Sequence, residues 1–267
     1  MSVSVVPTLD MEHDLASQGF DLIAGFDEVG RGALAGPVMV GCAIIRARDL
    51  EDAERPLQVP AGVADSKMLT EHRREAIFDE LCAWPAAWAV GQASNTEIDE
   101  WGIGYALGVA ALRALNQAER ALGLDGASSV IGSSGLSGSS ISSGLSGSFD
   151  LAGSTDSAGH PVSIGAILDG PNDYITKALN TFDAPSVPVP AHVVTKVKGD
   201  QHCATVAAAA VIAKVTRDRL MVSIAQGNPR YAPYEWARNK GYGSASHRAA
   251  IAEHGPTPLH RVSWKLI

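Results

Sequence analysis

Residues 23–37 read IAGFDEVGRGALAGP and place two adjacent carboxylates, Asp27 and Glu28, beside a Gly-Arg-Gly turn at the end of an apolar run. Burying charge there is costly unless the charge binds something. Neighbouring side chains of a strand point to opposite faces, so both acids can serve one site only where the strand ends or bends, and Gly30 and Gly32 allow such a bend. Carboxylates beside exposed backbone N–H groups suit a hard cation and a phosphate. We therefore expect the chemistry of the chain at this point.

The same glycines admit a second interpretation. Gly30-x-Gly32-x-x-Ala35 after a strand fits the relaxed dinucleotide-binding fingerprint, whose glycines bring the backbone close to a pyrophosphate at the start of a helix. That fold needs a helix next, whereas residues 38–45 read as a second buried strand. We predict two antiparallel strands joined by a glycine-rich turn, and keep a dinucleotide-binding oxidoreductase with bound NAD as an alternative.

Length and composition describe a globular protein. With 267 residues, 46% of them hydrophobic and 19% charged, the chain can bury a full core as one domain or as one domain with a small C-terminal attachment. Its longest apolar runs are too short to span a bilayer, and residues 1–10 lack the features of a signal peptide, so we predict a cytoplasmic protein with no membrane partner. The three cysteines have no pair spacing and are expected to be reduced thiols.

Charge is distributed unevenly along the chain. The formal net charge is -8, but residues 191–267 hold 11 Lys and Arg against 4 Asp and Glu. Polyanion binding depends on local cationic surface, so the negative total does not exclude a nucleic-acid partner.

The middle of the chain predicts alternating helices and strands. Thr70 is placed to cap a helix that follows it. Residues 86–93 read as a third strand, and residues 103–122 form an amphipathic helix ended by Gly123.

A low-complexity stretch follows this helix. Most of residues 126–159 are Ser or Gly, and the heptapeptide SSGLSGS occurs at both 133–139 and 142–148. Such a composition cannot bury enough apolar area to offset the entropy lost on ordering. We predict a flexible insert.

Two further carboxylates follow the insert. Residues 161–170 read as an apolar strand that ends in Asp169 and a glycine, and a further extended stretch follows at 187–197. Residues 198–219 then form a helix rich in Ala and Val, which suits close packing on a sheet and carries Asp218 among cations.

Asp27, Glu28, Asp169 and Asp218 together form an oxygen-only set without a His or Cys cluster. Such ligands select Mg²⁺ or Mn²⁺ over zinc. Two such ions activate a water and stabilise the leaving oxygen in phosphodiester hydrolysis.

The chain resembles the bacterial ribonuclease HII family, the type 2 ribonucleases H. The resemblance covers most of the chain from residue 23 to residue 264 and fails only in the insert and at the two ends. The motifs that carry it occur in the family's order: DEVGRGxLAGPV at 27–38, DSKxLT at 65–70, TEID at 96–99, LDG at 168–170, the KGD to RD segment at 198–218, KGYG at 240–243 and HRVSW at 260–264.

The resemblance implies an α/β ribonuclease H-like fold, with a mixed sheet flanked by helices and a small helical C-terminal part. It implies an endonuclease that cuts the RNA strand of RNA–DNA hybrids and also cuts 5′ to a single ribonucleotide in duplex DNA, leaving 5′-phosphomonoester products. Roles in ribonucleotide excision repair and DNA replication follow from that activity. The family's catalytic and metal-binding carboxylates fall on Asp27, Glu28, Asp169 and Asp218, with Mg²⁺ or Mn²⁺ as the cofactor. A hybrid-binding module without catalysis stays open as a further alternative.

The resemblance also implies substrate contacts. Gly30, Arg31 and Gly32 correspond to the element that contacts the ribose 2′-OH and the junction phosphates. Tyr242 corresponds to a tyrosine that packs on the neighbouring deoxyribose, and Lys198 and Thr205 correspond to phosphate contacts. The residues agree with this, because backbone at a glycine turn can reach a 2′-OH, the group that separates RNA from DNA.

The domain prediction has three parts: an N-terminal tail at 1–20, a catalytic domain at 21–230 that contains the insert, and a small helical part at 231–267. We expect a monomer. Two positions depart from the family pattern, with Ala210 in place of Ser and Trp264 in place of Phe. We expect neither to touch the metal site.

Overall fold

The computed structural model describes residues 6–63, 69–124, 161–181 and 183–267. The predicted Ser/Gly insert at 126–159 lies outside these ranges, as does most of the DSKxLT motif.

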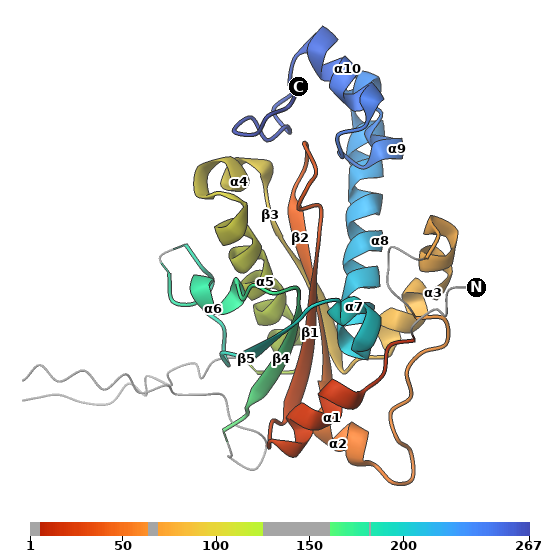
Figure 1. Cartoon of the computed structure of the whole chain (residues 1–267), viewed down its shortest axis with the longest axis vertical. Helices are drawn as coiled ribbons and strands as arrows, with labels where there is room; N and C mark the ends of the chain where they lie inside the picture. The colour runs from red at the N-terminus through yellow and green to blue at the C-terminus, as the bar shows by residue number, and fades with distance from the viewer. Residues whose placement is uncertain (1–5, 64–68, 125–160, 182) are drawn as a thin grey trace, which may run out of the picture.

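A mixed five-stranded sheet forms the centre of the molecule (Figure 1). The strand order is β3-β2-β1-β4-β5, and β1 pairs antiparallel with β2 and parallel with β4. The bounds are β1 Leu22–Val29, β2 Val38–Arg46, β3 Ala87–Ala93, β4 Ile164–Asp169 and β5 His192–Lys196. The predicted hairpin around the glycine-rich turn is thus confirmed. The dinucleotide-binding interpretation is wrong, because a strand stands where that fold needs a helix.

Two long helices cover opposite faces of the sheet. Helix α5 (Ile103–Ala121) packs on a core that includes Phe26 of β1, and α8 (Ala204–Gly227) packs on the other face. The fit of α8 is close: a Cβ atom built at Gly25 would lie 2.3 Å from the backbone carbon of Thr205. The predicted packing of an Ala- and Val-rich helix on the sheet is confirmed.

Shorter elements surround this core. Helix α3 (Glu71–Ala83) begins at the predicted cap, where the Thr70 hydroxyl accepts a hydrogen bond from the Arg73 N–H at 3.3 Å. Residues 10–17, inside the predicted tail, form a helix that buries Leu15. None of the helices in the described ranges is both long and apolar enough to cross a membrane. The remaining elements are α1 Asp10–Ser17, α2 Ala47–Glu51, α4 Asn95–Trp101, α6 Ile175–Ala178, α7 Gly199–His202, η1 Pro229–Tyr234, α9 Trp236–Asn239 and α10 Ala245–His254.

The last residues of the chain lie beyond the tip of the β1–β2 hairpin, at one end of the molecule (Figure 1). Isolated bridges join Ala33 to Tyr242 and Ala35 to His260. The C-terminal part and the Gly-Arg-Gly turn therefore build one surface.

Candidate active site

Asp27 and Glu28 stand near the end of β1 and face opposite sides of the sheet. Phe26 contributes to the core under α5, and Gly25 contacts α8, so alternation turns Glu28 toward α5 and Asp27 toward α8. Both nevertheless line one cavity of about 270 Å³ at the strand end, here named the carboxylate cavity. The end of the strand lets the two faces share a site.

Asp169 comes to the same cavity from the neighbouring strand. Strands β1 and β4 are paired in parallel as far as Phe26 and Leu168, so Asp27 and Asp169 are the next residues on adjacent strands. The Gly199 N–H donates to Asp169 Oδ1 at 2.7 Å, which fixes that carboxylate beside the start of α7.

Asp218 is the carboxylate that stands apart. It is buried on α8, where Lys214 Nζ contacts its two oxygens at 2.6 and 2.7 Å, and Arg74 of α3 lies 3.9 Å from it. Lys214 lines the carboxylate cavity, whereas Asp218 lines a separate hollow beside it. Burial lowers the pKa of Lys214, and its contact with Asp218 opposes that shift. The structure thus brings three of the four predicted carboxylates into one cavity and links the fourth to it through a lysine.

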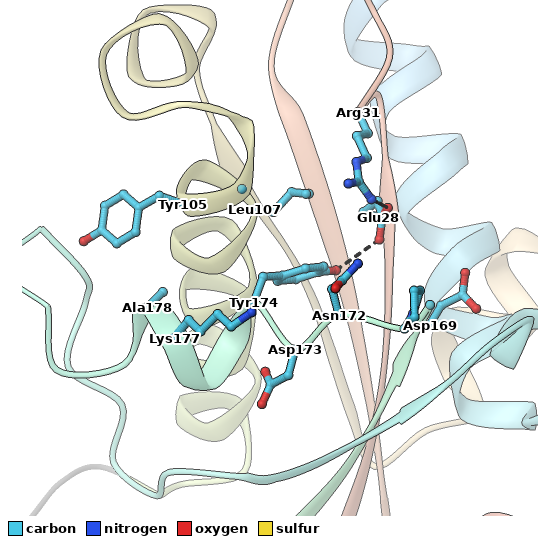
Figure 2. Close-up of a pocket in the computed structure, with 13 residues that line it drawn as sticks. Glu28, Arg31, Tyr105, Leu107, Asp169, Asn172, Asp173, Tyr174, Lys177 and Ala178 are labelled. Atoms are coloured by element: carbon cyan, nitrogen blue, oxygen red, sulfur yellow. Dashed lines mark hydrogen bonds and ion pairs between the residues drawn. The ribbon is translucent and has the colours of Figure 1, made fainter.

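Glu28 is held at both of its oxygens (Figure 2). Arg31 Nη1 donates to Oε1, and the Tyr174 hydroxyl donates to Oε2, each at 3.2 Å. Burial, followed by the nearby carboxylates, raises the pKa of Tyr174 well above its usual value. The phenol therefore keeps its proton and acts as a donor to Glu28.

The chemistry of these donors fits a hard divalent cation, because every candidate ligand is a carboxylate oxygen. Within the described ranges, no three His, Cys, Asp or Glu side chains are gathered closely enough to hold a metal ion. Asp218 is engaged by Lys214, and Glu28 by Arg31 and Tyr174. The acids therefore fit a cation by type and by shared location, with basic side chains balancing their charge.

Two fully buried arginines donate hydrogen bonds to the backbone of the Gly-Arg-Gly turn and of the residues that follow it. Arg217 of α8 donates to the carbonyl oxygens of Ala35, Pro37 and Lys240. Arg261 of the C-terminal part donates to those of Gly30, Arg31 and Gly36. Burial, with a smaller effect from Arg217, lowers the pKa of Arg261 to about 9. The planar, multiply donating guanidinium suits a turn whose carbonyls have no strand partner.

Most of the predicted substrate contacts gather at this turn. Gly30, Arg31, Gly32 and Tyr242 all line the carboxylate cavity. The Gly30 N–H donates to the Tyr242 hydroxyl at 3.1 Å, which ties the tyrosine to the turn. Lys198 is exposed next to Gly199, the residue that donates to Asp169.

Two sequence-based expectations need correction. Thr205 is fully buried, and its hydroxyl donates to Glu12 Oε1 at 2.8 Å, so it does not line the carboxylate cavity as a phosphate contact would. Ala210 lines the carboxylate cavity, contrary to the expectation that it lies away from the site. Trp264 instead lies over the Arg261 guanidinium, 4.8 Å from it.

Sequence reasoning missed several residues of the site. Lys214 had a usable signal, since it stands four residues before Asp218 on a predicted helix. Tyr174 had none, because it acts on Glu28, which is 146 positions away. Arg261 lies in the HRVSW motif, but nothing in that motif indicates the turn carbonyls that it contacts.

Comparisons with known proteins show what this chain is similar to. A family model described as Ribonuclease HII matches residues 24–122 and 170–267. A ribonuclease HII of Streptomyces avermitilis is 39% identical over 260 residues, which are 97% of this chain and 83% of that protein. A ribonuclease HII of Synechococcus elongatus is 33% identical over 97% of this chain and 93% of that protein.

Solved structures share the fold. The ribonuclease H2 of Pyrococcus horikoshii superposes with a TM-score of 0.57 at 23% identity, covering 92% of this chain and 94% of that one. The RNase HII in a PCNA complex from Archaeoglobus fulgidus gives 0.57 at 20% identity, with the same coverage. Bst-RNase HIII, solved in complex with Mn²⁺, gives 0.56 at 19% identity, with 95% and 71% covered.

Proposed function

The chain belongs to the ribonuclease HII family, and from this premise we propose that it hydrolyses RNA in RNA–DNA hybrids and cuts 5′ to single ribonucleotides in duplex DNA. It is an endonuclease of the ribonuclease H type. The observation that carries the proposal is the carboxylate cavity, which Asp27, Glu28 and Asp169 line together with the Gly-Arg-Gly turn. A dinucleotide-binding fold does not account for that arrangement, because β2 stands where that fold needs a helix.

We assign the catalytic and metal-binding roles to Asp27, Glu28, Asp169 and Asp218. Bound Mg²⁺ or Mn²⁺ would supply an activated water and a counter-charge for the leaving oxygen. Asp27 and Asp169 follow the last paired residues of adjacent strands, and Tyr174 and Arg31 orient the Glu28 carboxylate. The Mn²⁺ complex of the structural neighbour Bst-RNase HIII supports a divalent cation in this fold.

Ribose selection is proposed for the Gly-Arg-Gly turn. The backbone around Gly32 is open, since a Cβ atom there would meet nothing within 4 Å, so a sugar could approach it closely. A 2′-OH both donates and accepts hydrogen bonds, so backbone groups can read it. We assign phosphate contacts to Arg31, which lines the carboxylate cavity, and to the exposed Lys198, and we assign packing on the next sugar to Tyr242. A role in ribonucleotide excision repair and in replication would follow from such specificity.

Asparagine substitutions test the metal site. Asp27→Asn and Asp169→Asn should each lower cleavage at least about a hundredfold, because each removes a charge that the transition state needs and not a packing group. Melting temperature should stay equal or rise, since repulsion between carboxylates is relieved. The assay uses labelled duplexes carrying one ribonucleotide, an all-RNA strand or only DNA, with Mg²⁺, Mn²⁺ or EDTA.

Asp14→Asn is the matched control, because Asp14 is an exposed acid of α1 and should leave cleavage unchanged. Near wild-type cleavage by both site variants would contradict the metal-site assignment. A wild-type protein that binds hybrids but does not cut them with Mg²⁺ would favour the module without catalysis.

A further inference from the structure

A second cavity, of about 430 Å³, adjoins the carboxylate cavity on the α5 side of the sheet (Figure 2). Glu28, Arg31 and Asp169 line both cavities. The rest of this second cavity, here named the α5 cavity, is lined from α5 and residues 170–178. Its volume falls in the usual range of ligand sites.

The walls of the α5 cavity combine aromatic rings with a cation. Figure 2 shows Tyr105 and Lys177 on the side opposite Glu28 and Asp169. The Tyr105 hydroxyl contacts Thr181 Oγ1 at 2.5 Å, which holds the ring in place.

Of the two cations that line the α5 cavity, Arg31 pairs with Glu28, so Lys177 is the one that the cavity offers to a ligand. It is exposed, and no carboxylate among the described residues pairs with it. The nearby Asp173 accepts a hydrogen bond from the Thr176 N–H at 2.9 Å, so it is turned toward its own helix. An ammonium beside two tyrosines and several acids suits a sugar–phosphate unit better than a free anion, because the acids repel an anion that has no other contacts.

The lining residues show how the two cavities lie relative to the proposed cleavage point. Tyr242 and Gly32 lie in the carboxylate cavity only, whereas Tyr105 and Lys177 lie in the α5 cavity only. The three shared residues stand between them. A strand whose cleaved phosphate sits at Glu28 and Asp169 would therefore have one cavity on each side of that phosphate.

We propose that the α5 cavity binds the sugar–phosphate unit on the side of the cleaved phosphate away from Tyr242. The rings of Tyr105 and Tyr174 form the wall for the sugar, and Lys177 pairs with the phosphate. This inference rests on the proposed function and adds a second substrate contact region to it.

A charge-neutralisation cycle tests the pairing of Lys177 with one phosphate. The substrate is a duplex with one ribonucleotide. It is prepared in three modified forms, each with one neutral methylphosphonate at the first, second or third linkage on the side of the cleaved phosphate away from Tyr242. Equilibrium binding is measured in the cleavage-deficient Asp27→Asn background, so that cutting does not interfere. Lys177→Gln should weaken binding of the unmodified duplex roughly fivefold. At one of these linkages, the methylphosphonate should weaken duplex binding by the protein that keeps Lys177 by a similar factor. The same methylphosphonate should leave duplex binding by the Lys177→Gln variant unchanged.

Matched variants sharpen the outcome. Lys177→Arg should keep the coupling to that linkage, because it keeps the charge. Arg48→Gln removes an exposed cation from α2 and should bind every duplex like its parent. If Lys177→Gln binds like its parent, or loses affinity equally at every linkage, the subsite is overturned. If the wild-type protein cuts no ribonucleotide-containing duplex, the proposed function itself is overturned.

Discussion

Glu28 accepts a hydrogen bond at each carboxylate oxygen, one from Arg31 three residues along the chain and one from Tyr174 on a distant loop. A carboxylate held at both oxygens has a fixed orientation, which matters for a group that must present one oxygen to a cation or a water. The Tyr174 ring is buried, and its phenol stays protonated. The tyrosine is thus a positioning residue for Glu28.

Tyr174→Phe removes this donor and keeps the ring. We expect kcat to fall roughly tenfold while KM for the duplex stays nearly constant, because the substrate wall is retained and only the orientation of Glu28 is lost. The Mn²⁺ dependence of cleavage should shift, and the melting temperature should change little. Steady-state kinetics over a Mn²⁺ titration measure these effects.

Tyr231→Phe is the control for this change. Among the described residues the Tyr231 hydroxyl has no hydrogen-bond partner, so its loss should leave kcat unaltered. A Tyr174→Phe protein with wild-type kcat and wild-type Mn²⁺ dependence would show that Glu28 needs no such support.

At the scale of elements, the Gly-Arg-Gly turn depends on parts of the chain far from it. Arg261 donates to the Gly30 and Arg31 carbonyls, and the Tyr242 hydroxyl accepts from the Gly30 N–H. Arg217 donates to the carbonyls of Ala35 and Pro37, which follow the turn. Gly30 and Gly32 differ in what their backbone positions require. Gly30 has φ +81°, and a Cβ atom there would lie 2.1 Å from Arg217 Nε, whereas Gly32 has neither restriction.

Alanine at each glycine separates folding from recognition. Gly30→Ala should destabilise the protein by at least about 2 kcal/mol, because it combines a strained φ with a clash against a buried arginine. Gly32→Ala should keep the wild-type melting temperature and lower cleavage at a lone ribonucleotide strongly, since its methyl group meets only the incoming sugar. Thermal unfolding and the three-duplex assay provide both readouts.

Binding of Mn²⁺ by Gly32→Ala serves as the internal control, because the carboxylates are untouched. Unchanged preference for the lone ribonucleotide in Gly32→Ala would mean that ribose recognition lies elsewhere and the turn is only a bend.

The elements themselves could be read largely from the sequence. Residues 103–122 were predicted as a helix and α5 spans Ile103–Ala121, because apolar periodicity and a terminal glycine are local signals. The burial of Thr205 could not be read in this way. It depends on Glu12, which contacts it across 193 positions of sequence. Carboxylates at strand ends could be predicted from short patterns, whereas the contact of Tyr174 with Glu28 and the contacts of Arg261 with the turn carbonyls could not, because tertiary packing alone brings these residues together.

At the scale of the whole molecule, the sequence that joins α5 to β4 is long, yet its flanks are neighbours. Leu124 and Pro161, on either side of the undescribed segment, line one cavity. A short linker can therefore connect them.

Replacing residues 126–159 by a short Gly-Ser loop should leave cleavage and melting temperature nearly unchanged, because the entropy of loop closure varies slowly with length. Thermal unfolding and the hybrid cleavage assay compare the shortened and full chains. Loss of several degrees, or of cleavage, would show that this segment packs on the domain or contacts substrate.

Stability of the whole protein should also carry a pH dependence set by Glu119 of α5. This side chain is fully buried, with Oε1 accepting from the Val189 N–H at 3.2 Å and Oε2 without a partner among the described residues. Burial raises its pKa from the ordinary 4.5 to about 8. Between those values the folded protein keeps a proton that the unfolded chain releases. The free energy of unfolding should therefore fall as pH rises from about 4.5 to about 8.

Glu119→Gln removes the titrating group and keeps its shape. Its melting temperature relative to wild type should rise by about 5 °C between pH 5 and pH 8, because only wild type loses stability over that window. Calorimetry at matched ionic strength measures the difference, and Glu80→Gln, an exposed acid of α3, should show none. If the difference in melting temperature between Glu119→Gln and wild type stays constant from pH 5 to pH 8, then Glu119 titrates near its ordinary pKa. The buried carboxylate would then be charged in the folded protein and stabilised by its contacts.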